Sequence, residues 1–121
     1  HAYVRRQRQM CIRDRYVRIV KLTFMNDFSK EAASSLLVQL GKTKGFAAGM
    51  LFRLSVDISV TQRYSMTIWP DKTSEDKSWK LFGEKVLKKL RETGARVEVS
   101  RGPINEMQIS KDLDLSNFYT N

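Results

Sequence analysis

The stretch Tyr64-Ser-Met-Thr-Ile-Trp69 decides the fold of this chain of 121 residues. A β-strand presents its side chains alternately to two faces, which here places Tyr64, Met66 and Ile68 on one face and Ser65, Thr67 and Trp69 on the other. Pro70 ends the strand because it cannot donate a ladder hydrogen bond. Large apolar side chains occur on both faces, so we expect each face of the sheet to be covered.

Period-two alternation predicts three further strands, over residues 16–24, 50–56 and 95–100. Asp57–Ser59 connect the second strand to the third as a hairpin, and Gly102-Pro103 stop the last strand. Residues 105–121 form a polar tail, in which Met107 and Ile109 could make a short edge strand.

Two helices are predicted between the strands because apolar residues recur there at helical spacing. The first begins with Ser29 as its N-cap, continues to Leu40 and ends at Gly41. The second begins at Thr73, where a hydroxyl precedes an acid by three residues, and closes at Gly94.

The resulting order is strand–helix–strand–strand–helix–strand. Two right-handed split βαβ units in this order predict a ferredoxin-like α+β sandwich over residues 16–104, a four-stranded antiparallel sheet with both helices on one face. The tail is too short to cover the other face of the sheet. We therefore expect a homodimer that forms through this sheet face.

Residues 1–15 differ from the rest of the chain, with five Arg, one Asp, no Lys and no periodicity. The hexapeptide Met10-Cys-Ile-Arg-Asp-Arg15 resembles translated sequencing-adapter read-through from assembled environmental DNA, and a genuine basic arm is the alternative. We expect this segment to be non-native or disordered and exclude it from the fold. It lacks the apolar region of a secretory signal, and the longest stretch without a strongly polar residue is only Gly45–Phe52, so we expect a cytoplasmic protein.

The charge and the rare residues exclude several classes of chemistry. The net charge of +9 falls to +5 without residues 1–15, from 17 basic and 12 acidic residues, which is ordinary for a soluble domain and weak support for a nucleic-acid partner. The single His and the single Cys, His1 and Cys11, both lie in the excluded segment. Residues 16–121 therefore lack the side chains for Ser–His–Asp or Cys–His nucleophiles, disulfides and common zinc sites, and we expect neither a metal nor a cofactor.

Two segments resemble the dimeric α+β barrel superfamily, which includes the antibiotic-biosynthesis-monooxygenase-like and stress-responsive barrel domains. They are Gly45-Phe-x-x-Gly49 followed by a strand, and Tyr64–Trp69 leading into the acidic helix start of Asp71–Trp79. The resemblance covers Tyr16 to Arg101. It implies a dimeric barrel, but members include cofactor-free oxygenases, haem-degrading enzymes and proteins without a known reaction. The haem-degrading reading fails, because only Trp69 matches and the required His and Asn are absent.

The candidate ligand-binding residues are Trp69, Tyr64, Arg53, Met66 and Phe52. Cofactor-free oxygenases of this superfamily hold phenolic substrates with Trp, Tyr, Arg and Asn, so the resemblance implies a wall, a hydroxyl donor and an anion contact for Trp69, Tyr64 and Arg53. The alternatives are core packing for the two aromatic residues, and for Arg53 an ion pair with Asp57 or Glu98. The sequence identifies no catalytic residue.

These features predict a small-molecule-binding dimeric barrel domain, with a cofactor-independent monooxygenase acting on an aromatic substrate as its catalytic form. A non-catalytic ligand-sensing or structural dimerisation module is the main alternative. An RNA-binding domain of the same topology is a remote one, because Gln62–Trp69 contains no Gly and Arg18 occupies a position where a base-stacking aromatic is expected.

Overall fold

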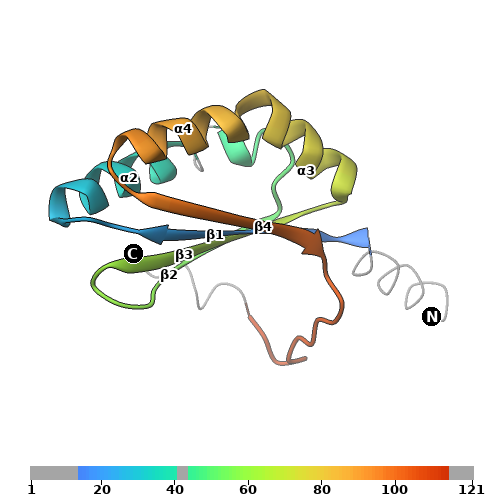
Figure 1. Ribbon diagram of the computed structural model, residues 1–121. Coiled ribbons are helices and arrows are strands. Elements are labelled where there is room, and N and C mark those ends of the chain that lie inside the picture. The colour runs from blue at the N-terminus through green and yellow to red at the C-terminus, as the bar shows by residue number, and fades with distance from the viewer. Residues whose placement is uncertain (1–13, 41–43, 115–121) are drawn as a thin grey trace, which may run out of the picture.

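The structure, a computed structural model, is a four-stranded antiparallel sheet with helices on one face (Figure 1). It describes residues 14–40 and 44–114. The elements are β1 (Tyr16–Thr23), α2 (Asp27–Leu40), β2 (Phe52–Asp57), β3 (Gln62–Trp69), α3 (Lys72–Ser78), η2 (Trp79–Gly83), α4 (Glu84–Glu92) and β4 (Arg96–Pro103). The strands lie in the order β2-β3-β1-β4, and each neighbouring pair is antiparallel. The predicted ferredoxin-like α+β sandwich is confirmed.

The core lies between the sheet and the helices. Strand β1 runs through the middle of the sheet, and Leu22, which faces the helices, is fully buried. The buried core cluster consists of Leu22, Phe24, Ala33, Leu90, Ala95 and Val97. Burying a side chain of the size of Leu22 stabilises the fold by about 1.5–3 kcal/mol relative to leaving it exposed. The apolar stripe of each helix therefore has a matching row of side chains on the sheet.

The opposite, helix-free face of the sheet is apolar over β2, β3 and the first half of β1, whereas β4 contributes polar side chains to it. Register places Val17 opposite Ile68 and Ile19 opposite Met66, and on the other side of β3 it places Phe52 opposite Ile68. Five large side chains of this face are between 37% and 44% exposed: Ile19, Phe52, Leu54, Val56 and Tyr64. After β4 the chain turns to this side of the sheet (Figure 1), where residues 104–107 border the apolar surface without covering it.

Both predicted helix starts are wrong, the first by three residues and the second by two. Helix α2 begins at Asp27, and the side chain that caps it belongs to Asn26, whose Oδ1 accepts from the backbone N–H of Ser29 at 2.8 Å. Asp71, rather than Thr73, caps α3, because its Oδ1 accepts from the N–H of Ser74 at 2.7 Å. Asp and Asn cap helices at least as well as Ser and Thr, so the earlier residue is used in each case.

The end of the last strand also differs from the prediction. Gly102 and Pro103 do not stop β4 but pair with Val17 and Tyr16. Pro103 can occupy the last position of this edge strand, where a missing N–H costs no ladder bond. The short edge strand predicted around Met107 and Ile109 is absent from the described residues, since 104–114 contain no strand.

Other predicted boundaries have different outcomes. Gly94 follows the last helix in a left-handed conformation, with φ of 90°, as a closing glycine should. The predicted stop at Gly41 and most of the excluded segment 1–15 lie outside the described residues. Among the residues that the structure describes, no helix has the length and apolar character needed to cross a bilayer.

The cap of α3 generates a pH-dependent prediction. The pKa of Asp71 lies below its usual value of 3.8, chiefly because the backbone N–H of Ser74 donates to the carboxylate. A lowered folded-state pKa means that the charged cap stabilises the fold above 3.8, and that this contribution disappears as the pH falls through the folded-state value. We expect Asp71→Ala to lower the urea concentration at the midpoint of unfolding at neutral pH, relative to the wild type. This difference between variant and wild type should become smaller in acid.

Asp71→Asn is the matched control, because it keeps a capping oxygen and removes the charge. Its midpoint should exceed that of Asp71→Ala at neutral pH, with less acid dependence than the wild type. A deficit in Asp71→Ala that stays constant from neutral pH into acid contradicts the prediction.

Candidate functional site

A cavity of about 100 Å³ lies between the helix-facing side of the sheet and the helices. All four strands, α2, η2 and α4 contribute to its lining, which is mostly apolar. The lining residues with charged or hydroxyl side chains are Arg18, Arg53, Ser65 and Thr67. A concave, largely apolar cavity with a few convergent polar groups is typical of a small-molecule site.

Both tryptophans of the chain line this cavity. Trp69, the last residue of β3, is only 1% exposed, and its Nε1–H donates to Oγ1 of Thr67 at 2.9 Å. Trp79 is the first residue of η2. The guanidinium carbon of Arg18 lies 5.2 Å from the ring centroid of Trp69 and 5.1 Å from that of Trp79, so one cation contacts both rings.

The helical segment over the cavity contains a π-helical turn, η2, between α3 and α4. Three residues of this turn, Trp79, Phe82 and Gly83, line the cavity. A Cβ atom at Gly83 would lie 2.5 Å from Cε3 of Trp79, so only glycine leaves room for the ring at its observed position. Single π turns inside α-helices are frequent at functional sites.

A buried carboxylate anchors this end of the cavity. Glu75 of α3 is fully buried, and its Oε2 accepts from Nε of Arg18 at 2.9 Å and from Nε of Arg101 at 3.0 Å. Arg101 also pairs with Asp76 and lies 5.3 Å from the ring centroid of Trp79. Two arginines and two carboxylates therefore form a balanced cluster that joins α3 to β1 and β4.

The two arginines of this cluster experience opposite effects. Burial lowers the pKa of Arg18 more than its attraction to Glu75 raises it. For Arg101, the hydrogen bond to Glu75 dominates and raises the pKa. Arg18 is thus the more desolvated cation, held charged inside the fold by the Glu75 carboxylate and the tryptophan rings.

Arg53 has a different environment. It lies on the helix-facing side of β2, opposite Thr67 in the register, and lines the cavity. Within the described ranges Arg53 makes no hydrogen bond or ion pair, because Asp57 pairs with Arg63 at 2.6 Å. Burial, followed by repulsion from Arg63, lowers the pKa of Arg53. The alternative ion pair of Arg53 with Asp57 or Glu98 does not form within the described chain, and such a pair between subunits stays a prediction.

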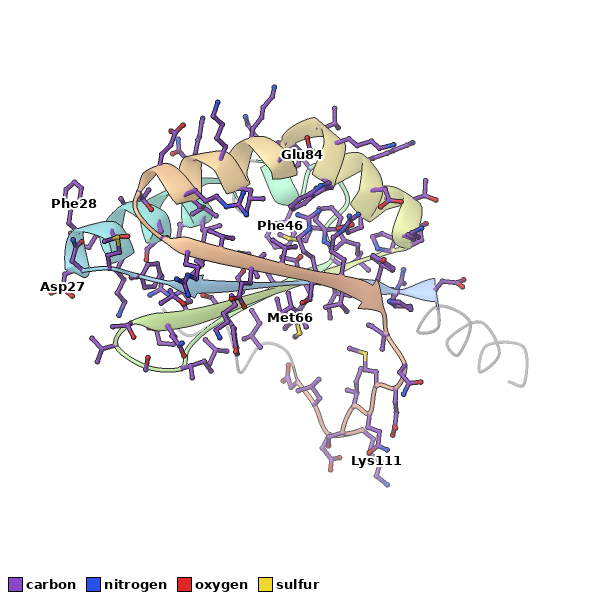
Figure 2. All side chains as sticks on the ribbon, in the orientation of Figure 1. Asp27, Phe28, Phe46, Met66, Glu84 and Lys111 are labelled. Atoms are coloured by element: carbon purple, nitrogen blue, oxygen red, sulfur yellow. The ribbon has the colours of Figure 1, made fainter. Side chains whose placement is uncertain are left out.

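The five sequence-predicted site residues do not share one cavity. Trp69 and Arg53 line it. Tyr64, Met66 and Phe52 lie on the helix-free face, where Phe52 is paired with Ile68, and Figure 2 shows Met66 pointing away from the helices. This placement does not test their predicted role in ligand binding. A ligand that contacts these three residues would have to bind on the helix-free side of the sheet.

Sequence reasoning missed Arg18 and Glu75 as parts of the site and did not include Trp79 among the candidate residues. A signal for Arg18 was available, because it shares the strand face of Val20 and Leu22 and its charge therefore points into the core. Glu75 had no such signal, since acids are common in the first turn of any helix. Within residues 14–40 and 44–114, no three His, Cys, Asp or Glu side chains gather as a metal site would need.

Comparison with known proteins supports the fold. No protein-family model matches the sequence, and no curated protein matches it. A variant of SnoaB, a cofactor-independent oxygenase from Streptomyces nogalater, matches with a TM-score of 0.64 and 13% identity over 78% of this chain and 96% of its own. A dimeric ferredoxin-like protein from an uncultured marine organism matches with a TM-score of 0.65 and 12% identity, over 81% of this chain and 94% of its own.

A Deinococcus radiodurans protein provisionally assigned as an antibiotic biosynthesis monooxygenase matches with a TM-score of 0.64 and 15% identity, over 78% of this chain and 97% of its own. At these identities the likeness establishes the ferredoxin-like fold, and activity has to be argued from the site.

The buried cluster generates a stability prediction. We expect Glu75→Gln to reduce the free energy of unfolding by about 3 kcal/mol, because it leaves Arg18 and Arg101 without their buried counter-charge. Asp76→Asn is the matched control at the partly exposed rim and should cost less than about 1 kcal/mol. Urea unfolding of both variants measures the difference. Equal losses would show that burial of Glu75 adds nothing to the cluster.

Proposed function

We propose that this protein is a small-molecule-binding domain of the dimeric α+β barrel type, and that its ligand is an aromatic compound. The observation that carries the proposal is the cavity. Both tryptophans and Phe82 line it as aromatic walls, and the arginines Arg18 and Arg53 also line it. Aromatic rings stack favourably on such walls, at about 0.5–1.5 kcal/mol beyond the burial of their area.

The catalytic form of the proposal is a cofactor-independent monooxygenase. A phenol and O₂ give a quinone and water: one oxygen atom enters the ring, the other leaves as water, and the ring supplies all four electrons. The domain would contribute binding and orientation, which hold the ring in a reactive position. The shared fold with the oxygenase SnoaB supports this form.

A second candidate is a ligand-binding domain without catalysis. It is favoured by the composition of residues 16–121, which contain no His or Cys and so offer no side chain with an ordinary pKa near neutrality as a general base. In this form the same cavity binds the aromatic compound and no reaction follows.

The proposed assembly is a homodimer through the helix-free sheet face. The half-exposed apolar side chains of this face support it, since soluble monomers rarely leave a continuous apolar surface uncovered. The similar ferredoxin-like protein from the uncultured marine organism is itself dimeric. Packing two such faces together would close the two sheets into a barrel.

The assembly is tested by moving a charge into this face. We expect the wild type to sediment as a dimer at micromolar concentration, and Leu54→Glu to sediment as a monomer, because Leu54 lies on the helix-free face opposite Met66. Leu81→Glu is the control, since Leu81 is exposed on the helical segment. A monomeric wild type, or dissociation by Leu81→Glu alone, contradicts the assembly.

The cavity function is tested by ligand binding and oxygen consumption. Full-length protein is mixed with phenol and substituted phenols, and both tryptophan fluorescence and dissolved oxygen are followed. We expect phenols to change the fluorescence, and Trp69→Phe to reduce any oxygen uptake about tenfold or more through misplacement of the ring. Phe28→Leu, which alters an exposed aromatic residue, should leave uptake unchanged.

Binding without oxygen uptake supports the non-catalytic form. Uptake that Trp69→Phe does not affect places the reaction outside this cavity. Absence of any binding contradicts the small-molecule function.

A further inference from the structure

Apart from Arg18, the polar side chains of the cavity lie together at one corner. Arg53 of β2 lies directly opposite Thr67 of β3, and Ser65 lies two residues further along β3 on the same face. Directly opposed residues have Cβ atoms about 4.5–5.5 Å apart, and diagonal neighbours remain within reach of a long side chain. One guanidinium and two hydroxyl groups therefore converge on the same part of the cavity.

Arg53 is the unbalanced charge of this cavity. The other lining cation, Arg18, is paired with the buried Glu75, and the neighbouring Arg63 is paired with Asp57. Arg53 has no acidic partner among the described residues, and no Asp or Glu lines the cavity. A half-buried cation without a partner is a costly arrangement in a folded protein, and an anion would relieve it.

The hydroxyl groups are placed to assist such an anion. The Thr67 hydroxyl accepts from Nε1–H of Trp69 at 2.9 Å, which leaves its own proton available to donate. Ser65 is buried, lines the cavity and makes no side-chain hydrogen bond among the described residues. Both hydroxyls can therefore donate to an oxygen that Arg53 also contacts.

The size of the cavity limits the rest of the ligand. A cavity of about 150 Å³ accommodates benzene in a protein core. The present cavity of about 100 Å³ is smaller and partly open to solvent, so it has no room for a fused polycyclic system and can enclose a single ring at most. The Trp69 and Trp79 rings line the apolar part, which is where that ring would lie.

We propose that the ligand of this cavity is a single-ring aromatic carboxylate whose acid group is bound by Arg53, Thr67 and Ser65. The inference rests on the proposed function and names its ligand class. Guanidinium fits a carboxylate because its N–H groups can donate two parallel, charge-assisted hydrogen bonds. The Glu75 cluster cannot serve this role, since its two arginines are already engaged by carboxylates of the chain.

Benzoate and its neutral isostere benzamide are the probes, because they share one ring and differ in charge. Both tryptophans line the cavity, so intrinsic fluorescence reports binding in the full chain, and titration calorimetry gives an independent dissociation constant. We expect the wild type to bind benzoate about tenfold to a hundredfold more tightly than benzamide, as for a hydrogen bond to a charged group.

Arg53→Gln should remove this preference by weakening benzoate about tenfold to a hundredfold while leaving benzamide nearly unchanged. Lys85→Gln is the matched control, because it makes the same change in net charge at an exposed position on α4 and should alter neither affinity. Far-ultraviolet circular dichroism and a thermal melt verify that both variants fold. The retained benzamide affinity distinguishes loss of the anion contact from loss of the cavity.

Two results overturn the inference in different ways. If phenol or benzamide binds as tightly as benzoate, or if Arg53→Gln does not weaken benzoate, the anion site is wrong and the aromatic cavity stands. If none of the three compounds binds the wild type, the cavity function itself fails and the inference fails with it.

Discussion

The placement of α3 on this sheet depends on one buried carboxylate. Glu75 is the only charged side chain among the fully buried residues of the described chain, and it contacts arginines from two strands, Arg18 of β1 and Arg101 of β4. A buried charge is tolerated only when it is paired, so the two ion pairs hold α3 where both arginines reach Glu75. That position sets where the helical segment continues, and with it the π turn that carries Trp79 over the cavity.

Trp79 couples this ion cluster to the cavity. Its ring contacts both arginines of the cluster, while Gly83 gives the ring room against its own helix. The same Arg18 that neutralises Glu75 also contacts Trp69 at the end of β3. The aromatic walls are therefore held by electrostatic contacts as well as by packing, and a rigid wall is what a binding site for a flat ring requires.

The two faces of the sheet are suited to different tasks. The helix-facing side carries the charges and hydroxyls that line the cavity. On the helix-free side an apolar surface extends over β2, β3 and the first half of β1, and it is bordered by polar side chains of β4 such as Glu98 and Ser100. Strand β2 shows the division most simply, because Arg53 faces the cavity and its neighbours Phe52 and Leu54 face away. Because side chains alternate along a strand, the six residues of β2 contribute both to the cavity and to the opposite face of the sheet.

The sequence by itself determined the element order, the ferredoxin-like sandwich and the large apolar side chains on both faces of β3, because periodicity is a local property of the chain. The alternation along β3 also predicted that Tyr64 and Trp69 lie on opposite faces of the sheet. Helix starts were less accurate, since Asn26 and Asp71 competed as caps with nearby hydroxyl residues.

Only the tertiary structure decided which charges are balanced. Arg18 and Glu75 are 57 positions apart, and Arg101 and Glu75 are 26 apart, so no local pattern could have paired them. The same applies to Arg53, whose expected partner Asp57 is taken by Arg63 across the hairpin. Ion pairing depends on which side chains the fold brings within a few ångströms of each other, and that distance is fixed only when helices and sheet are packed together.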